Sequence, residues 1–326
     1  MLFCCRKMNL KLGCSQFERP IFLRRECPLM NYIVMDMEWN TAYCKKLDGF
    51  MNEIIEIGAV KLDAALQEID SFSVIIKSQI GKRLQSRVKT LTHLTNDDIA
   101  NGISFQNAIM LFTAWLGTEE NTFLTWGDGD IRTLIKNCEY FLNTAELPFV
   151  HHYCDLQKYC QSFTDAASSG QQLGLSVAAE KLGINPDDYP HHRALDDSRL
   201  SVACLKSVFD ADALKKYTRP CDREFYARLA FKPYYIRDMH NPLVDKKQFR
   251  CVCNLCGGKV KKEKNWKFSN NSFRAVFYCP QCDYRFRVAV RYKQLYDRLE
   301  VRKTFTEVKE ATQETKAENT AVSADA

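Results

Sequence analysis

The sequence predicts a mixed α/β fold, in which helices flank a β-sheet, followed by a small C-terminal module rich in cysteine. Two observations predict the first part: three strand-like segments open the pattern, and strand and helix patterns then alternate up to about residue 209. A third predicts the second part, because two Cys-x-x-Cys pairs lie in a strongly basic segment. A chain of 326 residues has room for both.

The opening strand-like segments predict an antiparallel meander and lie at 32–35, 53–63 and 71–77. The polar residues 41–52 between the first two predict a turn. Residues 84–116 predict mainly helix, with a helix start near Thr95. Further strands are expected at 121–126 and 149–153, and further helices after the Gly127–Asp130 turn, at 172–182 and at 194–209.

Charge divides the chain further. Residues 245–303 hold 16 Lys and Arg against five Asp and Glu, a net charge of +11; the whole chain carries +6, so the remainder carries −5. A basic module on a mildly acidic body indicates a polyanionic partner. The expected parts are an extension that is disordered or not native (1–29), an α/β domain (30–210), a connector (211–250), a basic module (251–303) and a disordered tail (304–326).

The cellular compartment is predicted from what the sequence lacks. No apolar run approaches the roughly 20 residues of a membrane span, and the first residues lack the pattern of a signal peptide. We therefore expect a cytoplasmic protein with no membrane partner. Because the cytosol is reducing, the 15 cysteines indicate metal binding and buried thiols rather than disulfides.

The first strand ends in two carboxylates, Asp36 and Glu38. Side chains alternate along a strand, so both project from the same face. Two like charges beside a buried strand need a cation or a raised pKa. Taken alone, such a pair is more often the polar end of a strand, but later acidic residues favour the cation.

Two later carboxylates and a histidine fit the same site. Asp130 opens a helix at the edge of its inward stripe, whereas Asp128 suits an N-cap or solvent. Asp197 lies on the inward stripe of the helix at 194–209, where it is costly unless something satisfies it. His192 precedes that helix, and from a loop it reaches the same pocket, although a lone loop histidine is usually a surface residue.

These residues predict a chemistry. Carboxylate oxygens select Mg²⁺ or Mn²⁺ over zinc, so Asp36, Glu38, Asp130 and Asp197 are the predicted ligands. Four carboxylates can hold two such ions about 3.5–4 Å apart, which suits in-line displacement at phosphorus. A histidine that is neutral near pH 7 can take the proton from the attacking water. The prediction is phosphodiester hydrolysis, with His192 as the general base.

The same residues carry a family resemblance. Asp36-Met-Glu38 resembles the first motif of the DEDDh 3′–5′ exonucleases, TWGDGDIRTL with Asp130 the second, and HHRALDDSRL with His192 and Asp197 the third. The match covers about residues 31–210, within the RNase T and polymerase-proofreading superfamily, and is most similar to the histone-mRNA exonuclease branch. The resemblance implies an RNase H-like, mixed five-stranded sheet. It also implies release of nucleoside monophosphates from single-stranded 3′ ends, with RNA slightly favoured over DNA.

Four residues are candidate substrate contacts. Many relatives carry threonine where this chain has Asn40, whose amide can still hydrogen-bond a terminal nucleotide. Trp39 and Trp126 could stack on a base, although core packing is an equal alternative for Trp126. Met37 completes the set.

Two knuckles, Cys253-x-x-Cys256 and Cys279-x-x-Cys282, predict a four-thiolate structural Zn²⁺ site in a zinc ribbon. So small a module should need the metal to fold. Cys251 is the spare cysteine, with no assigned role. A pair of redox dithiols is the alternative, but the two pairs form a matched set.

The zinc module is also a candidate nucleic-acid interface. Its Lys and Arg residues should attract phosphate, and Trp266, Phe268, Tyr284 and Phe286 should stack on bases. A solubilising face or a protein-docking surface is the alternative. For the whole chain, two other functions stay open: a non-catalytic nucleic-acid-binding or regulatory protein on an exonuclease scaffold, and a proofreading factor. The sequence leaves protein partners unknown.

Overall fold

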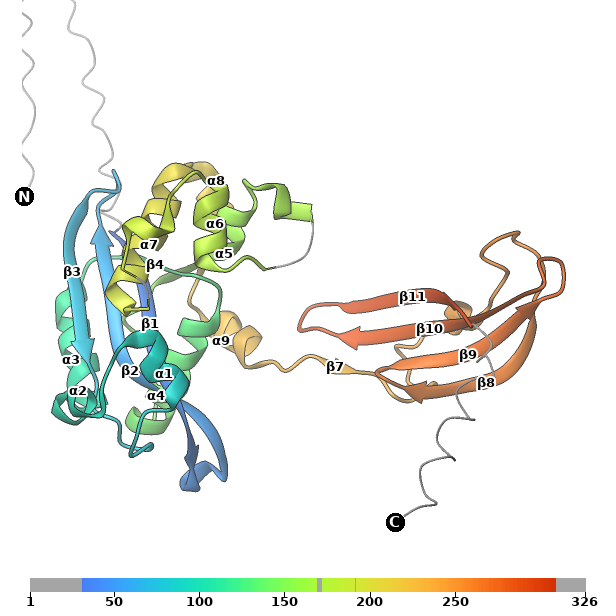
Figure 1. The fold of residues 1–326 in the computed structure, drawn as a ribbon, viewed down its shortest axis with the longest axis horizontal. Coiled ribbons are helices and arrows are strands. Elements are labelled where there is room, and N and C mark those ends of the chain that lie inside the picture. The colour runs from blue at the N-terminus through green and yellow to red at the C-terminus, as the bar shows by residue number, and fades with distance from the viewer. Residues whose placement is uncertain (1–30, 169–171, 191, 309–326) are drawn as a thin grey trace, which may run out of the picture. The chain divides into compact units, whose positions relative to one another are not determined.

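The computed structural model describes residues 31–168, 172–190 and 192–308. The chain divides into two compact units, Met1–Cys221 and Asp222–Ala326, which are described separately (Figure 1). No helix among the described residues has the length and apolar character needed to cross a bilayer. The extension expected at 1–29 lies outside the described residues.

The first unit is built on a six-stranded sheet in the order β3-β2-β1-β4-β5-β6. β1 (Asn31–Cys44), β2 (Gly49–Leu62) and β3 (Glu68–Ile75) form the expected antiparallel meander. β4 (Asn121–Thr125) and β5 (His152–Asp155) run parallel to β1, and β6 (Thr218–Pro220) returns antiparallel to β5. The mixed sheet is confirmed, but it has six strands rather than five, because the short β6 was assigned to the connector.

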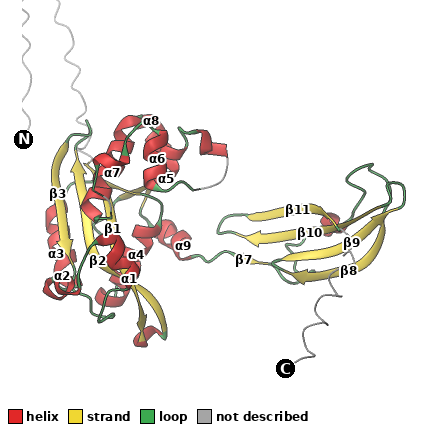
Figure 2. Ribbon diagram, viewed as in Figure 1, coloured by secondary structure: helices red, strands yellow, loops and turns green. Residues whose placement is uncertain are grey.

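Helices cover both faces of this sheet (Figure 2). Neighbouring side chains of β4 show the two layers, since successive residues of a strand point to opposite faces. Phe123 contacts Phe112 at a ring-centroid distance of 6.1 Å, whereas Leu124 belongs to a core cluster with Leu200 and Leu205. The α-helices of this unit are α1 (Ser86–Thr92), α2 (Asn96–Asn101), α3 (Phe105–Leu116), α4 (Gly129–Leu142), α5 (Leu156–Gln161), α6 (Leu175–Lys181), α7 (Ala194–Ser207) and α8 (Ala211–Tyr217).

Helix α7 lies unusually close to strand β2. A Cβ atom added to Gly58 would lie 2.1 Å from the backbone nitrogen of Leu195, so only glycine fits there. The hydroxyl of Ser198 donates to the Gly58 carbonyl at 3.0 Å and fixes the first turns of α7 on the sheet. The start of α7, where Asp197 lies, is therefore tied to the strand that pairs with β1.

The structure corrects the turn expected at 41–52. β1 continues to Cys44 and β2 begins at Gly49, so these residues form the end of a long hairpin. Thr41 pairs with Asn52, and their side chains hydrogen-bond at 2.8 Å. The hairpin end extends beyond the core, and Phe50 is 77% exposed. Of residues 41–52 only Cys44 and Met51 are buried, so the apolar alternation that reveals a strand does not develop.

The helical stretch expected at 84–116 is divided into α1, α2 and α3. His93 ends α1 in the left-handed conformation, with φ of 57°, and Gly102 follows α2. Thr95 caps α2 in a capping box with Asp98, which confirms the helix start expected there.

The second unit is a β-sheet module. Its strands β8 (Lys261–Ser269), β9 (Ser272–Cys279), β10 (Tyr284–Gln294) and β11 (Leu299–Glu307) form an antiparallel sheet, and β7 (Tyr234–Tyr235) pairs with β10. Helix α9 (Arg223–Ala230) precedes them. One face of the sheet forms an apolar core that includes Phe273, Phe286 and Val288.

The boundaries of the units differ from those expected. The connector predicted at 211–250 is shared: α8 and β6 belong to the first unit, whereas Ile236 and Val244 lie in the core of the second. The predicted tail starts too early, since residues 304–307 belong to β11. Its part from residue 309 onwards lies outside the described residues.

Candidate active site

Strand β1 presents Asp36 and Glu38 beside a β-bulge. The register of β1 with β2 shifts between Glu38 and Trp39, and bulges commonly re-aim side chains next to active sites. Glu38 lies directly opposite Glu56 of β2, so two acidic residues face each other across the pair. Facing like charges destabilise a sheet unless a cation compensates them.

Asp197 joins the pair from α7. One carboxylate oxygen from each of Asp36, Glu38 and Asp197 lies within 4.8 Å of the others. The preceding residue, Asp196, points elsewhere, since its Oδ1 is 3.8 Å from a guanidinium nitrogen of Arg199. The structure thus places Asp197, which was predicted on the inward stripe, beside Asp36 and Glu38, and it leaves Asp196 outside this group.

Asp130 reaches the same site from the start of α4. Gly127 has a φ of 84°, and its carbonyl accepts hydrogen bonds from the hydroxyls of Tyr153 at 2.8 Å and Thr125 at 2.5 Å, which fix the preceding turn. Asp130 is only 5% exposed, and its Oδ1 accepts from the Met37 amide at 3.2 Å. This bond ties α4 to β1 between the first two carboxylates.

Asp128 stays outside this group. Its Oδ2 accepts from Arg132 Nε at 2.8 Å on the surface, and its side chain does not cap α4. Of the two alternatives for Asp128, solvent rather than capping is correct.

The grouped carboxylates raise one another's pKa values. Burial, followed by Asp130, Asp197 and Glu38, raises the pKa of Asp36 well above its usual range. Burial, then Asp197 and Glu56, raises the pKa of Glu38 to about 8. Burial also raises the pKa of Asp130 to about 7, against hydrogen bonds from backbone amides. Such a cluster needs positive charge to be ionised at neutral pH.

The guanidinium of Arg193, next to the cluster, is bound to the carboxylate of Glu56. Arg193 binds the carboxylate of Glu56 through Nε at 3.1 Å to both oxygens and through a terminal nitrogen at 2.7 Å. Glu56 is 1% exposed, and its Oε2 also accepts from the amide of Ala194 at 3.4 Å. Sequence reasoning missed this pair, which fixes the start of α7 to β2.

His192 lies directly before Arg193. It is exposed, and its φ of 60° places it in the left-handed region, which is rare for a residue with a side chain. It stands outside α7, two residues before Ala194, as predicted. The next residue, Arg193, is fixed by its ion pair with Glu56. His191 lies outside the described residues.

The chemistry of this donor set suits hard divalent cations. It consists of carboxylate oxygens, which Mg²⁺ and Mn²⁺ prefer, and it lacks the thiolates that zinc prefers in structural sites. The three mutually close oxygens come from β1 and from α7, and α7 is held at Gly58 against β2, the strand that pairs with β1.

Comparison with known proteins identifies this arrangement. A family described as Exonuclease (RNase_T) matches residues 33–205. The Probable 3′-5′ exonuclease KapD of Bacillus subtilis is 30% identical over 162 residues, which cover 49% of this chain and 75% of KapD. The chain belongs to the exonuclease family. This confirms the DEDDh resemblance and the prediction of a 3′–5′ exonuclease.

Two further relatives of this exonuclease are named for different nucleic acids, one for RNA and one for DNA. Human 3′-5′ exoribonuclease 1 is 29% identical over 158 residues, covering 46% of this chain and 44% of that protein. A PolC-type DNA polymerase III from Thermotoga petrophila is 29% identical over 176 residues, covering 52% of this chain and 11% of the polymerase. The family match ends at residue 205, before the second unit.

The candidate substrate contacts of the exonuclease unit are placed unevenly. Trp39 is half-buried beside the bulge and its ring lies near Gly129, whereas the Met37 side chain is buried. Asn40 does not fit the prediction, because it is 1% exposed and both ends of its amide bind backbone, at Arg83 and Gln85. Trp126 packs on the core and donates to the Leu173 carbonyl at 3.0 Å, which matches its packing alternative.

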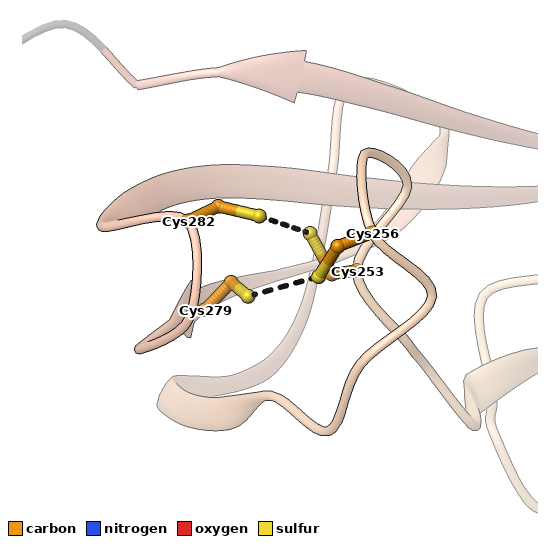
Figure 3. A group of neighbouring side chains, drawn as sticks. All are labelled: Cys253, Cys256, Cys279 and Cys282. Carbon is orange, nitrogen blue, oxygen red and sulfur yellow. Dashed lines mark hydrogen bonds between the residues drawn. The ribbon is translucent and has the colours of Figure 1, made fainter.

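The four predicted zinc ligands come together in the second unit (Figure 3). Their sulfur atoms all lie within 4.8 Å of one another. Cys253 and Cys282 are 4.0 Å apart and Cys256 and Cys279 are 3.6 Å apart. A tetrahedron with zinc–sulfur bonds of about 2.3 Å has edges of about 3.8 Å. These two separations differ from that edge by about 0.2 Å, so the group of thiols has the size of a zinc site.

The first knuckle has the backbone of a metal site. The amides of Leu255 and Gly258 donate to the sulfurs of Cys253 and Cys256, each at 3.4 Å, which stabilises thiolates. Gly257 has a φ of 71°, which a glycine adopts at no cost. Cys251 lies outside the group, with its thiol directed to the Val252 carbonyl.

Proposed function

We propose that this exonuclease hydrolyses the terminal phosphodiester bond of single-stranded nucleic acid with two Mg²⁺ or Mn²⁺ ions, and that His192 is its general base. The observation that supports this most is the convergence of Asp36, Glu38 and Asp197, with Asp130 hydrogen-bonded to the strand between the first two. The mutual repulsion that raises the pKa values of Asp36 and Glu38 is what a bound cation would relieve.

The ions, when bound, would neutralise this charge and lower the pKa of a water molecule. The ligand oxygens would come from four carboxylates, those of Asp36, Glu38, Asp130 and Asp197. His192, on the loop before α7, takes the proton of the attacking water. Trp39, half-buried beside the bulge, is the remaining candidate for stacking on the terminal base.

RNA is the favoured substrate. The support is the name of the human relative, an exoribonuclease, and the motif resemblance to the histone-mRNA branch. The PolC-type relative is named as a DNA polymerase, so both substrates belong in the test.

The test is a gel time course on matched 5′-labelled single-stranded RNA and DNA. We expect a ladder that shortens from the 3′ end with Mg²⁺ or Mn²⁺, and we expect Asp36→Ala and Asp197→Asn to abolish it while their circular dichroism is unchanged. Asp196→Asn is the matched control and should keep its activity. Omitting Mg²⁺ is a cleaner control than EDTA, which would also remove zinc.

Binding without shortening would overturn the proposal in favour of a non-catalytic protein on the same scaffold. Activity of Asp36→Ala near that of the wild type would refute the ligand set. Faster hydrolysis of DNA than of RNA would reverse the proposed preference.

A further inference from the structure

The second unit has a sheet with two opposite faces. Along β9 and β10, apolar residues such as Phe273, Phe277 and Val288 point into the core. The alternate residues, among them Arg274 and Arg287, must point to the other face, because side chains alternate along a strand.

The pairing register aligns cations on that other face. Residues directly opposite each other on paired strands share a face, so each paired set forms a row across the sheet. Each of the three rows contains two cations, and the rows are Lys261-Tyr278-Arg285, Lys264-Val276-Arg287-Thr306 and Lys267-Arg274-Ala289-Thr304. We call this surface the cationic face.

The cationic face is hollowed at its second and third rows. A depression of about 550 Å³ is lined by Lys264, Lys267, Arg274 and Arg287, and no carboxylate is among its lining residues. Nε of Arg274 is buried and has no hydrogen-bond partner in the described part of the chain. Lys267 lies directly opposite Arg274, which brings two like charges together. Both features cost stability, and an anion in the hollow would relieve both.

The aromatic residues of this unit lie elsewhere, contrary to the expectation for Trp266, Phe268, Tyr284 and Phe286. Trp266 packs against Phe249 and Phe277, at ring-centroid distances of 4.9 and 5.9 Å, and Phe286 is fully buried. Phe268 and Tyr284 pack against Phe273 and Phe286. Within the three rows, Tyr278 is the only aromatic residue, and its hydroxyl donates to Asp283 at 2.7 Å.

We propose that the cationic face binds the phosphate backbone of the nucleic-acid substrate by charge, without stacking on its bases. The choice of nucleic acid over other polyanions rests on the proposed function of the first unit. Arg285 of the first row already binds the carboxylate of Glu263, through Nε at 2.8 Å and a terminal nitrogen at 3.1 Å. The second and third rows are two residues or about 7 Å apart along β9, so their four cations can meet successive phosphates of an extended strand. Binding of this kind is strongly salt-dependent and tolerant of sequence.

The experiment measures oligonucleotide affinity by fluorescence anisotropy across salt concentrations, with the full chain carrying Asp36→Ala so that the probe survives. The test variant adds Lys264→Ala, Lys267→Ala and Arg287→Ala. The control variant instead adds Lys246→Ala, Lys247→Ala and Lys262→Ala, three exposed cations of the same unit that lie outside the three rows. Each phosphate that the protein no longer neutralises should reduce the slope of log affinity against log salt by about 0.7–0.9.

We expect the slope of the test variant to fall by about two and the control variant to keep the wild-type slope. A chain of abasic nucleotides should bind like oligo(dT). Equal reductions in both variants, or an unchanged slope in the test variant, would overturn the proposal, and so would much weaker binding of the abasic chain. In a second assay, binding to phosphatidylserine vesicles is measured. If the test variant loses vesicle binding but keeps its oligonucleotide binding, the cationic face would be assigned to a membrane instead.

The active site is checked separately. With Asp36 restored, the test variant should keep its zinc content and should hydrolyse the p-nitrophenyl ester of thymidine 5′-monophosphate, which has no neighbouring phosphates, at the wild-type rate. If the wild type itself hydrolyses nothing, the proposed function fails, while the salt slopes still decide what the cationic face binds.

Discussion

Replacing Arg193 by alanine should destabilise the exonuclease unit and disturb the loop that carries His192. The carboxylate of Glu56 is 1% exposed, and Arg193 is its bidentate partner. Removing one member of a buried ion pair costs about 3–5 kcal/mol, because it leaves the other charge buried without compensation. The Arg193 side chain is 40% exposed, so water can partly replace it, and we expect about 3 kcal/mol.

The assay is urea unfolding followed by tryptophan fluorescence. Trp39, Trp115 and Trp126 lie in the exonuclease unit and only Trp266 in the other, so the signal reports mainly on the former. Arg199→Ala is the matched control, since this α7 arginine makes only long, surface ion pairs of 3.7 and 3.8 Å. Such pairs contribute about 0–1 kcal/mol.

A double-mutant cycle isolates the pair. In the background of Glu56→Gln the buried charge is gone, so Arg193→Ala should cost less by about 1–3 kcal/mol. Additive effects, or a cost of Arg193→Ala no greater than that of Arg199→Ala, would refute the reasoning that this ion pair holds α7 on the sheet.

Three further outcomes are expected. His192→Ala should lower the hydrolysis rate by about 10²–10⁴ at unchanged stability, measured by single-turnover kinetics, and a smaller loss would move the base to another group. Cys279→Ser should lower the zinc content, measured by atomic absorption, and unfold the second unit; unchanged zinc would refute the ligand set. Because burial and then Asp197 raise the pKa of Glu38 to about 8 from an ordinary 4.5, the folded metal-free chain holds a proton that the unfolded chain releases above about pH 4.5. The folded metal-free chain therefore loses stability as pH rises from about 4.5 towards 8, because Glu38 becomes charged in the cluster. Mg²⁺ would compensate that charge, so the increase in melting temperature that it causes should be greater at pH 8 than at pH 6. An equal increase at both pH values would contradict the shift.

The parts of the fold that were predicted from the sequence are those with a strong apolar period. α4 and α7 have such a period, and β2 has a nearly continuous apolar run that is buried. The hairpin end at 41–52 and the edge strand β6 were missed because their side chains are mostly exposed, and exposed strands carry no apolar alternation.

The carboxylates were predictable for a different reason. Asp36 stands out because it and Glu38 place two like charges beside a buried strand, and Asp197 because it places a charge on an inward stripe. A single sequence records both conflicts directly. The four cysteines stand out through spacing alone. The cationic face was predicted only as composition, because its order depends on which residue of β8 pairs with which residue of β9, and β8 contains two register shifts.

Glu56 and Arg193 show where sequence reasoning ends at this site. Glu56 is an acidic residue within the apolar stretch EIIEIGAV, which is the same kind of conflict that identified Asp197. Its position alone would have suggested a further metal ligand, since it lies directly opposite Glu38. Only the partner decides otherwise, because the guanidinium that follows His192 neutralises Glu56 and also lowers the pKa of Glu38. One acidic residue of the cluster thus binds the loop of the proposed base, while the other four stay available to a metal.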